Sequence, residues 1–479
     1  MTSGIGTAAW TLLRSARELY RDDPAVTATL RRHLDRFEAP LRLAVAGPAG
    51  AGKSTVVNAI LGEAVAPIGP VPTWYQDGPV PRAIGYPPDG PGRELATVHN
   101  GPGARWLPPE PDVDEVSVDW PAHALRHLTI VDCPADSPRP GTATSPATDG
   151  AALAYVRRAA DAVLYLTPAL TDLDALRGEG AGDTVPVDTI VVLSRADEVG
   201  GGRIDALGEA RRIARRHARE VAVHEVGQTV VALSGLVGYA GRTLRETDFA
   251  ALARLAERPR EALEEHLLSA DRFVAERFPV ALSVPVRAGL LDRFGLFGVR
   301  LASTLIRTGT NSAGTLAAEL VQRSGLTGLR DSMTELFTHR ADVLKARSAL
   351  LALESVVRAA PNAGTRRLSA DLERAFANAH EIAELRLLGA LRSGRVELPG
   401  GLDEEALRLT GAHGTGVAAR LGTGATVPAG ELWQVTTDAL VRWRDTATDP
   451  AYRQDQRRAA SVVVRTCEGI LTDLARQHP

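Results

Sequence analysis

The nine residues Gly47-Pro48-Ala49-Gly50-Ala51-Gly52-Lys53-Ser54-Thr55 carry the pattern that decides the fold of this chain. They match the phosphate-binding loop G-x-x-x-x-G-K-[ST] at every fixed position. Apolar residues at 41, 43 and 45 indicate a buried strand before the loop, and residues 56–61 indicate the apolar face of a helix after it. The sequence therefore predicts a strand–loop–helix unit that binds a nucleoside triphosphate, or that descends from one that did.

Each part of this loop has a physical role. Its three glycines let successive backbone N–H groups converge on phosphate oxygens at a helix N-terminus. Lys53 is expected to neutralise the β- and γ-phosphates, and Ser54 to offer its hydroxyl to Mg²⁺. The chain keeps lysine at this position although only one other lysine, Lys345, occurs among its 55 basic residues. The residues predicted to contact the phosphates are Gly47, Ala49, Gly50, Ala51, Gly52, Lys53, Ser54 and Thr55, with Lys53 and Ser54 also expected to act in catalysis.

Composition limits the remaining possibilities. A length of 479 residues suggests about three domains, and 44% hydrophobic with 24% charged residues is typical of a soluble globular protein. A net charge of −3 gives no electrostatic reason to expect a nucleic-acid partner. Cys133 and Cys467 show neither metal-ligand spacing nor a disulfide framework, which favours the cytoplasm. We expect no signal peptide and no membrane-spanning helix, so any membrane contact should be peripheral.

The chain divides into three predicted parts: 1–38, 39–242 and 243–479. The first suggests two helices, at 8–20 and 24–37, whose apolar faces must be buried against another part of the chain. The second alternates apolar strands with helices or loops, the pattern of an α/β domain with a mostly parallel sheet. The third is helical, so we expect an all-α bundle, or stalk, formed by the N-terminal helices and the C-terminal half. The predicted strands are 41–46, 80–84, 115–119, 128–132, 162–166, 189–193 and 229–233, with 62–111 mostly loop and one long helix from about 329 to Pro361.

Two further patterns concern the metal ion and the base of the nucleotide. Asp132 ends an apolar strand about 80 residues after the loop, where an acid can hold Mg²⁺ through water; an ordinary strand-end aspartate is the alternative. Ser194-Arg195-Ala196-Asp197 follows a later strand, at the place where GTPases carry [NT]-K-x-D. An aspartate there accepts hydrogen bonds from guanine N1–H and the exocyclic amine, a pair of donors that adenine lacks. Asp197 is therefore expected to read guanine, while Ser194 and Arg195 line the base.

The last predicted strand ends in a third candidate. Ser234-Gly235 fits a loop that packs on the base, and a plain strand-end turn fits nearly as well. The expected ligands are thus GTP or GDP together with Mg²⁺, the metal being held by Ser54 and Asp132. An unrelated ATP-dependent P-loop protein would require Asp197 to have no part in base recognition.

The order of these motifs, followed by helices, resembles that of bacterial dynamin-like proteins, and among them the isoniazid-inducible group of actinobacteria. The resemblance covers about residues 40 to 355. It implies a GTPase head on a helical neck and stalk, assembly as a homo-oligomer or with a dynamin-like paralogue, and GTP hydrolysis coupled to membrane remodelling at the inner face of the plasma membrane. The stretches that carry it are Thr73-Trp74-Tyr75-Gln76-Asp77-Gly78, 193–200, Leu268-Ser269-Ala270-Asp271-Arg272-Phe273, and 323–326 through 340–350.

Three departures from the family pattern weaken the case for hydrolysis. Ala135 stands where the family's Asp-x-Pro-Gly motif has the glycine whose N–H contacts the γ-phosphate; the N–H remains but the glycine's conformational freedom does not. The segment before Thr73 is shortened, so Thr73 is either the switch threonine or simply part of the Thr-Trp-Tyr strand. Residues 49–51 offer no polar side chain to position water. The alternative function is therefore a hydrolysis-impaired scaffold that binds GTP or GDP and partners a complete paralogue.

Three helical or loop stretches could contact lipid. Residues 288–307 could form an amphipathic element at a membrane surface, but the spacing favours a helix packed in the bundle core. Residues 411–430 could be a stalk-tip loop, or an ordinary connection. The arginines between 211 and 219 favour a solvated helix face over a lipid or phosphate site.

Overall fold

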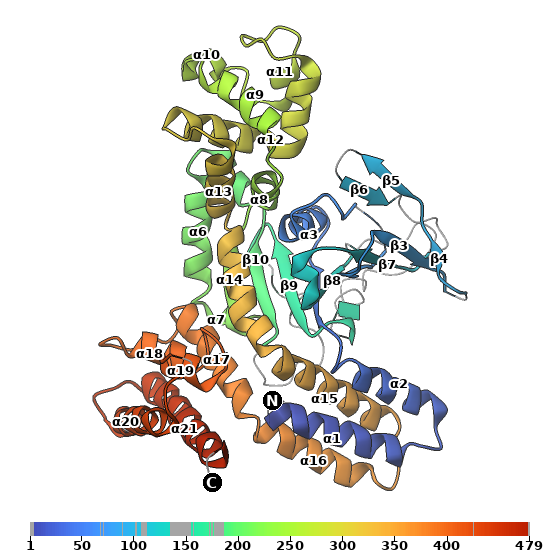
Figure 1. The fold of residues 1–479 in the computed structure, drawn as a ribbon, viewed down its shortest axis with the longest axis vertical. Helices are drawn as coiled ribbons and strands as arrows, with labels where there is room; N and C mark the ends of the chain where they lie inside the picture. Colours follow the sequence, from blue (N-terminus) through green and yellow to red (C-terminus); the bar gives the residue numbers. More distant parts are fainter. Residues whose placement is uncertain are drawn as a thin grey trace.

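The computed structural model describes residues 4–477 except 68, 70, 89, 101–102, 107–112, 135–154, 157, 172, 174–175, 177–185 and 425. At its centre lies a nine-stranded sheet with the strand order β11-β10-β9-β1-β8-β2-β7-β3-β4, and a separate two-stranded sheet joins β5 and β6 (Figure 1). The strands are β1 Leu41–Ala46, β2 Thr73–Asp77, β3 Arg82–Tyr86, β4 Arg93–Glu94, β5 Thr97–Asn100, β6 Gly103–Trp106, β7 Glu115–Trp120, β8 Leu128–Asp132, β9 Ala162–Thr167, β10 Thr189–Leu193 and β11 Thr229–Ala232.

The direction of the strands determines what meets at the sheet edge. Strand β1 pairs in parallel with β8 and β9, and β10 pairs in parallel with β9 and β11. The carboxyl ends of these five strands therefore share one edge, the usual ligand edge of an open α/β sheet. Strand β2 runs antiparallel to β8, so its first residue, Thr73, pairs with Asp132 at the end of β8. The sheet is mostly parallel, as the alternating pattern predicts.

Helices cover both faces of the sheet and continue beyond it. Beyond Ala232 the described residues contain helices but no strand. The helices are α1 Gly4–Leu19, α2 Pro24–Asp35, α3 Lys53–Leu61, η1 His123–Arg126, η3 Ala196–Glu198, α5 Val199–Gly202, α6 Ala206–His217, α7 Val221–His224, α8 Gly235–Arg242, α9 Glu246–Ala256, α10 Arg260–Glu264, α11 Ala270–Val274, α12 Val284–Arg307, α13 Ala313–Ser324, α14 Leu326–Leu336, η4 Thr338–Arg340, α15 Ala341–Ala359, α16 Thr365–Ala377, α17 His380–Arg392, α18 Leu402–Leu409, α19 Val417–Leu421, α20 Ala429–Thr448 and α21 Gln454–Gln477.

Alternation along the central strands creates two hydrophobic cores. In β1, Leu43 and Val45 point into one core and Ala44 and Ala46 into the other, because successive side chains leave a strand on opposite faces. The first core runs without interruption into the helices α1, α2, α14 and α15. Helix α1 packs against α15, α2 and α16, so the N-terminal helices and part of the C-terminal half build one bundle, which lies below the sheet in Figure 1. The second core is closed by α6, α8, α12 and α13.

This second core settles the position of residues 288–307. They lie within α12, and Phe294 and Phe297 are buried among the residues of the second core. The structure thus agrees with the interpretation of a packed helix. None of the described helices is long and apolar enough to cross a membrane.

Two expectations about secondary structure are wrong. The single long helix predicted from about 329 is broken: α14 ends at Leu336, and α15 begins only at Ala341. Phe337 and Arg340 between them are both buried, which takes the backbone out of the helical path. The stretch 62–111, predicted to be mostly loop, contains strands β2 to β6. These strands are two to five residues long, and the proline and glycine residues lie mainly between them, where they do not prevent strand formation.

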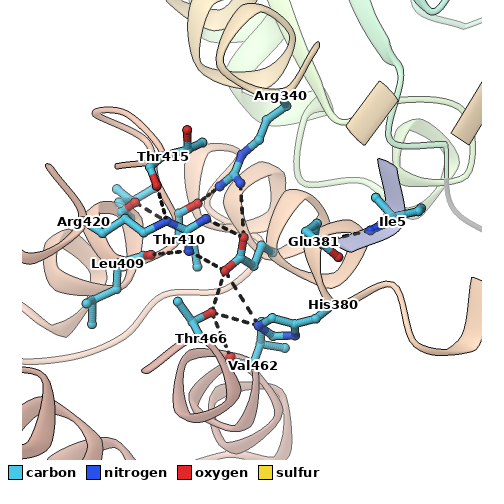
Figure 2. A network of polar contacts seen from close by, with 12 residues as sticks. Ile5, Arg340, His380, Glu381, Leu409, Thr410, Thr415, Arg420, Val462 and Thr466 are labelled. Carbon is cyan, nitrogen blue, oxygen red and sulfur yellow. Dashed lines mark hydrogen bonds and ion pairs between the residues drawn. The ribbon is translucent and has the colours of Figure 1, made fainter. Parts of the chain in front are cut away.

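The C-terminal helices α17–α21 form a third core of their own, which we call the C-terminal lobe. Between this core and the first lies Glu384 of α17, whose side chain is 3% exposed. Figure 2 shows that its carboxylate accepts hydrogen bonds from Arg340 (3.1 Å), Arg420 (2.6 and 3.0 Å) and Thr466 (2.8 Å). Burial alone would raise the pKa of Glu384, but the hydrogen bonds and charges of the two arginines outweigh it and hold that pKa below its usual value. We call this group the Glu384 cluster.

The domain boundaries predicted at residues 38 and 242 remain predictions. Helix α8 lies just before residue 242 and packs closely on α12 and α13, which follow it.

Candidate nucleotide-binding site

The phosphate loop connects β1 to α3 and needs its glycines for two different reasons. At Gly47 the backbone has φ 141°, and a Cβ would lie 2.1 Å from the backbone oxygen of Leu166 in β9. Gly50 and Gly52 have open space around them but adopt φ of 73° and 84°, the left-handed region that favours glycine. Gly52 is the N-cap of α3 and no side chain caps it. The first N–H groups of α3 thus face a site suited to an anion.

Lys53 is held inside this loop. Its ammonium donates hydrogen bonds to the backbone oxygens of Gly47 (2.9 Å) and Pro48 (3.1 Å), and the residue is 8% exposed. An ammonium group has three donors in rotatable positions, so it can hold the loop and meet a phosphate oxygen at the same end of the cavity. The long side chain is therefore positioned before any ligand arrives.

Ser54 and Asp132 meet beside the loop. Both residues line the cavity. Burial raises the pKa of Asp132 to about 6, and the hydrogen bond from Ser54 and the charge of Lys53 offset part of that rise. A buried hydroxyl and carboxylate are hard oxygen donors of the type that Mg²⁺ prefers. These residues fit the predicted metal site.

Thr73 is the first residue of β2 and is buried against the same edge. Its hydroxyl donates to the backbone oxygen of Val71 at 3.4 Å, and its backbone pairs with Asp132. Thr73 is therefore part of the Thr-Trp-Tyr strand, the second of the two interpretations of this residue. Thr73 nevertheless lines the cavity.

The base end of the site follows β10. Ser194 is buried, its backbone N–H donates to the oxygen of Thr167, and its Oγ has no hydrogen-bond partner among the residues that the structure describes. Arg195 has φ 51°, the one non-glycine residue of the described chain with positive φ, and its guanidinium pairs with Glu198 at 2.5 Å. Asp197 lies in the short helix η3. Backbone strain of this kind is typical of ligand sites.

One cavity of about 520 Å³ joins the two ends. A cavity of that size fits the usual range for small-molecule sites. Of the predicted site residues, it brings together Ala49, Gly50, Ala51, Gly52, Lys53, Ser54, Thr55, Thr73, Asp132, Ser194, Arg195, Asp197 and Gly235.

Three predicted residues are placed differently. Gly47 does not line the cavity but supports it through its close approach to β9. Ser234 is fully buried and caps α8, its hydroxyl accepting from the N–H of Val237; it does not line the cavity either. Ser234 is thus a helix N-cap just after β11, and of the pair Ser234-Gly235 only Gly235 lines the cavity. Ala135 lies outside the described residues.

Eight residues that line the cavity are absent from the predicted site: Val56, Pro67, Gly69, Val71, Cys133, Pro134, Glu198 and Leu236. Cys133 and Glu198 each follow a predicted site residue directly or closely, so their positions in the motifs were a usable signal. Leu236 follows Gly235 at the start of α8 and had no chemical signal, because an aliphatic side chain at a helix start is ordinary.

A phosphate loop and a guanine-type motif at the two ends of one cavity, on a mostly parallel sheet, define a P-loop protein of the GTPase type with an attached helical bundle. A comparison with models of known protein families finds no match. The isoniazid-induced protein IniC of Mycobacterium tuberculosis, from strains CDC 1551 / Oshkosh and ATCC 25618 / H37Rv, is 35% identical over 488 residues, which cover 98% of this chain and 98% of the relative. The chain therefore belongs to the isoniazid-induced, dynamin-like family of bacterial proteins.

Solved structures described as an oligomerised bacterial dynamin pair, in work on the long-range sensing and tethering of membranes, also match. Two of them are 10% and 11% identical, cover 99% of this chain and 74% and 75% of their own chains, and give TM-scores of 0.33 and 0.30. A likeness at that score adds nothing further about this chain.

Proposed function

We propose that this protein binds GTP and GDP at the cavity between the phosphate loop and η3, and that GTP hydrolysis there drives membrane remodelling at the inner face of the plasma membrane. One observation carries the binding part. Lys53 and Ser54 at one end, and Ser194 and Asp197 at the other, line a single cavity large enough for a nucleotide. Family membership supports the membrane part, since dynamin-like proteins act on membranes.

Each residue of the cavity has a role that follows from its chemistry. Lys53 and the N–H groups of α3 bind the phosphates, and Asp197 accepts hydrogen bonds from the guanine edge. Ser54 and Asp132 would hold Mg²⁺, which when bound neutralises charge on the phosphate oxygens. Arg195 and Glu198 pair with each other beside Asp197, and both line the cavity at this end.

A second candidate function is nucleotide binding without efficient hydrolysis, in a scaffold that assembles with itself or with a dynamin-like paralogue. The observation that favours it is the wall around the phosphate end. Residues 49–51 contribute no polar side chain, and the Thr73 hydroxyl is directed to the backbone oxygen of Val71. A residue that orients the attacking water is a regular part of GTP hydrolysis in P-loop proteins.

The first experiment measures binding and turnover on one sample of the full chain with Mg²⁺. Fluorescent GTP and ATP report affinity, and phosphate release is followed with and without anionic vesicles. The proposed hydrolase predicts GTP binding and turnover that vesicles stimulate, both lost in Lys53→Ala. GTP binding without phosphate release under either condition would favour the scaffold instead.

A substitution at the base end tests nucleotide choice. Asp197→Asn removes an acceptor for two guanine donors, and losing such charged hydrogen bonds should weaken GTP binding by at least tenfold with little change for ATP. Asp205→Asn is the matched control, because Asp205 does not line the cavity, its side chain is 63% exposed and makes no capping hydrogen bond, and it contacts Arg203 at 3.8 Å. Guanine selection would be ruled out if the unaltered chain bound GTP and ATP equally well and Asp197→Asn changed neither affinity.

A further inference from the structure

Helix α12 contains a break in its backbone at Gly295. This residue has φ 63° and ψ 171°, while the helix continues on both sides. Only glycine adopts that region readily, so the break depends on the missing side chain. A Cβ added here would lie 2.9 Å from Cδ2 of Leu236, so the break also lets α12 pass close to α8.

The break lies next to the base end of the nucleotide cavity. Leu236, which faces Gly295, lines that cavity. Five residues after the break, Arg300 donates a hydrogen bond of 2.8 Å to the backbone oxygen of Gly202, which closes the left-handed glycine run that follows Asp197. Helix α12 also packs directly on η3. One helix thus contacts both loops that flank the base.

Helix α9 contacts both halves of α12, through Arg293 before the break and Arg307 after it, but each half also has a partner of its own. The half before the break is joined to the segment around α11: Arg287 is buried and donates to the backbone oxygens of Phe273 and Ala275 (2.8 Å), and its guanidinium stacks 4.3 Å from the ring of Phe278. The half after the break is attached to the nucleotide loops through Arg300. Figure 1 shows the first half and α11 at the end of the molecule that projects away from the sheet.

A buried ion pair holds the present bend. Arg293, two residues before Gly295, pairs with Asp248 of α9 and donates to the backbone oxygen of Thr243. Both charged side chains are less than a fifth exposed. Hinges are built at a few positions that absorb a change of backbone angles, and a glycine in a helix is such a position. Leu290 and Phe294, before the break, belong to the second core, so a change of the bend moves this part of the core with it.

We propose that occupancy of the base end of the cavity is coupled to the bend at Gly295, so that α11 and the first half of α12 change position when nucleotide binds. The inference rests on the proposed nucleotide binding. A base that displaces the start of α8 changes the bend of α12 through the contact of Leu236 with Gly295. A base that displaces η3 changes it through the hydrogen bond of Arg300. Coupling of this kind is reciprocal, so a substitution that biases the bend must also change nucleotide affinity.

The test compares two glycine-to-alanine substitutions in the same helix. Gly295→Ala places a side chain where the backbone does not tolerate one and opposes the break. Gly289→Ala, six residues earlier, meets nothing within 4 Å and has no unusual backbone angle, so it is the matched control. Hydrogen exchange of residues 270–294 is measured with and without saturating GDP and Mg²⁺, and fluorescent GDP gives the affinities.

We expect GDP to change exchange in residues 270–294 of the unaltered chain and of Gly289→Ala, and not in Gly295→Ala. We also expect at least a fivefold change of GDP affinity in Gly295→Ala and less than twofold in Gly289→Ala. GDP binding that leaves these peptides unchanged, or a Gly295→Ala chain that responds like the control, overturns the inference. Should Gly295→Ala fail to fold, Arg300→Met is used instead, because it removes the contact with Gly202. A change in hydrogen exchange on GDP binding as large in Arg300→Met as in the unaltered chain would also overturn the inference.

A chain that binds neither GDP nor GTP overturns the proposed function, and this inference with it. That result is distinguishable from binding without coupling, because affinity and exchange are measured separately.

Discussion

Replacing Glu384 by glutamine should loosen the C-terminal lobe while leaving the head intact. Glutamine has the size of glutamate but no charge, so the guanidinium groups of Arg340 and Arg420 lose the one carboxylate they share. Arg340 is 2% exposed and cannot recover this loss from water. The remaining bonds of Arg340 and Arg420 run to backbone oxygens, including those of Thr410 and Leu409 (Figure 2).

The magnitude follows from the burial of the cluster. Breaking a buried ion pair by removing one partner costs about 3–5 kcal/mol, because a buried charge stays without compensation. At roughly 1.4 kcal/mol for each factor of ten, even the lower figure raises the population of the opened lobe about 100-fold. Amide hydrogen exchange in α17, α20 and α21 measures that population directly.

Glu468→Gln provides the control in the same lobe. Glu468 pairs with Arg444 at 2.7 Å, but the two side chains are 47% and 57% exposed, and such pairs contribute about 0–1 kcal/mol. We therefore expect at most about a fivefold change in exchange for the control. If Glu384→Gln also stays within about fivefold of the unaltered chain, the buried cluster does not hold the lobe and the reasoning fails.

The same cluster gives a pH dependence with a defined sign. The pKa of Glu384 is held below its ordinary value of 4.5, so the folded state favours the ionised carboxylate. Its contribution to stability is complete above the unfolded-state pKa and is lost as the pH falls below about 4.5. Glu384→Gln should remove this part of the acid sensitivity of the lobe, and exchange measured at pH 7 and pH 4 tests it.

Three further predictions concern single positions. Gly325→Ala should destabilise the protein by about 2 kcal/mol or more, because φ is 90° and a Cβ would lie 2.1 Å from the backbone oxygen of Ala232. Gly328→Ala, in the open interior of α14, should instead stabilise the protein by up to about 1 kcal/mol. Urea denaturation of the two variants compares these effects. Lys345→Met should lower the free energy of unfolding by about 2 kcal/mol, because the Lys345 ammonium donates to two backbone oxygens just before β1, at 2.8 and 3.2 Å. Equal urea midpoints for the variant and the unaltered chain would contradict this. Thr73→Val should lower GTP turnover at least tenfold with unchanged GTP affinity if Thr73 acts as the switch threonine; unchanged turnover would leave it a strand residue only.

The sequence by itself determined the features that depend on neighbouring residues. The phosphate loop is contiguous, so its spacing alone identifies it. The strands 41–46, 128–132 and 189–193 were predicted to the residue, because a central parallel strand is buried on both faces and has a continuous apolar pattern with sharp ends. The family resemblance and the fold class follow from the order of such local elements along the chain.

The tertiary structure decided what depends on contacts between distant segments. Arg340 and Glu384 are 44 residues apart, and the burial of Arg340 breaks a helix that its own sequence favours. The short strands in 62–111 form because neighbouring strands supply their hydrogen bonds, which no local pattern records. Gly295 is an ordinary glycine in an apolar stretch by its sequence, and only the structure shows that α12 breaks there, beside Leu236. The physical reason is the same in each case: packing free energy from a distant partner outweighs local propensity.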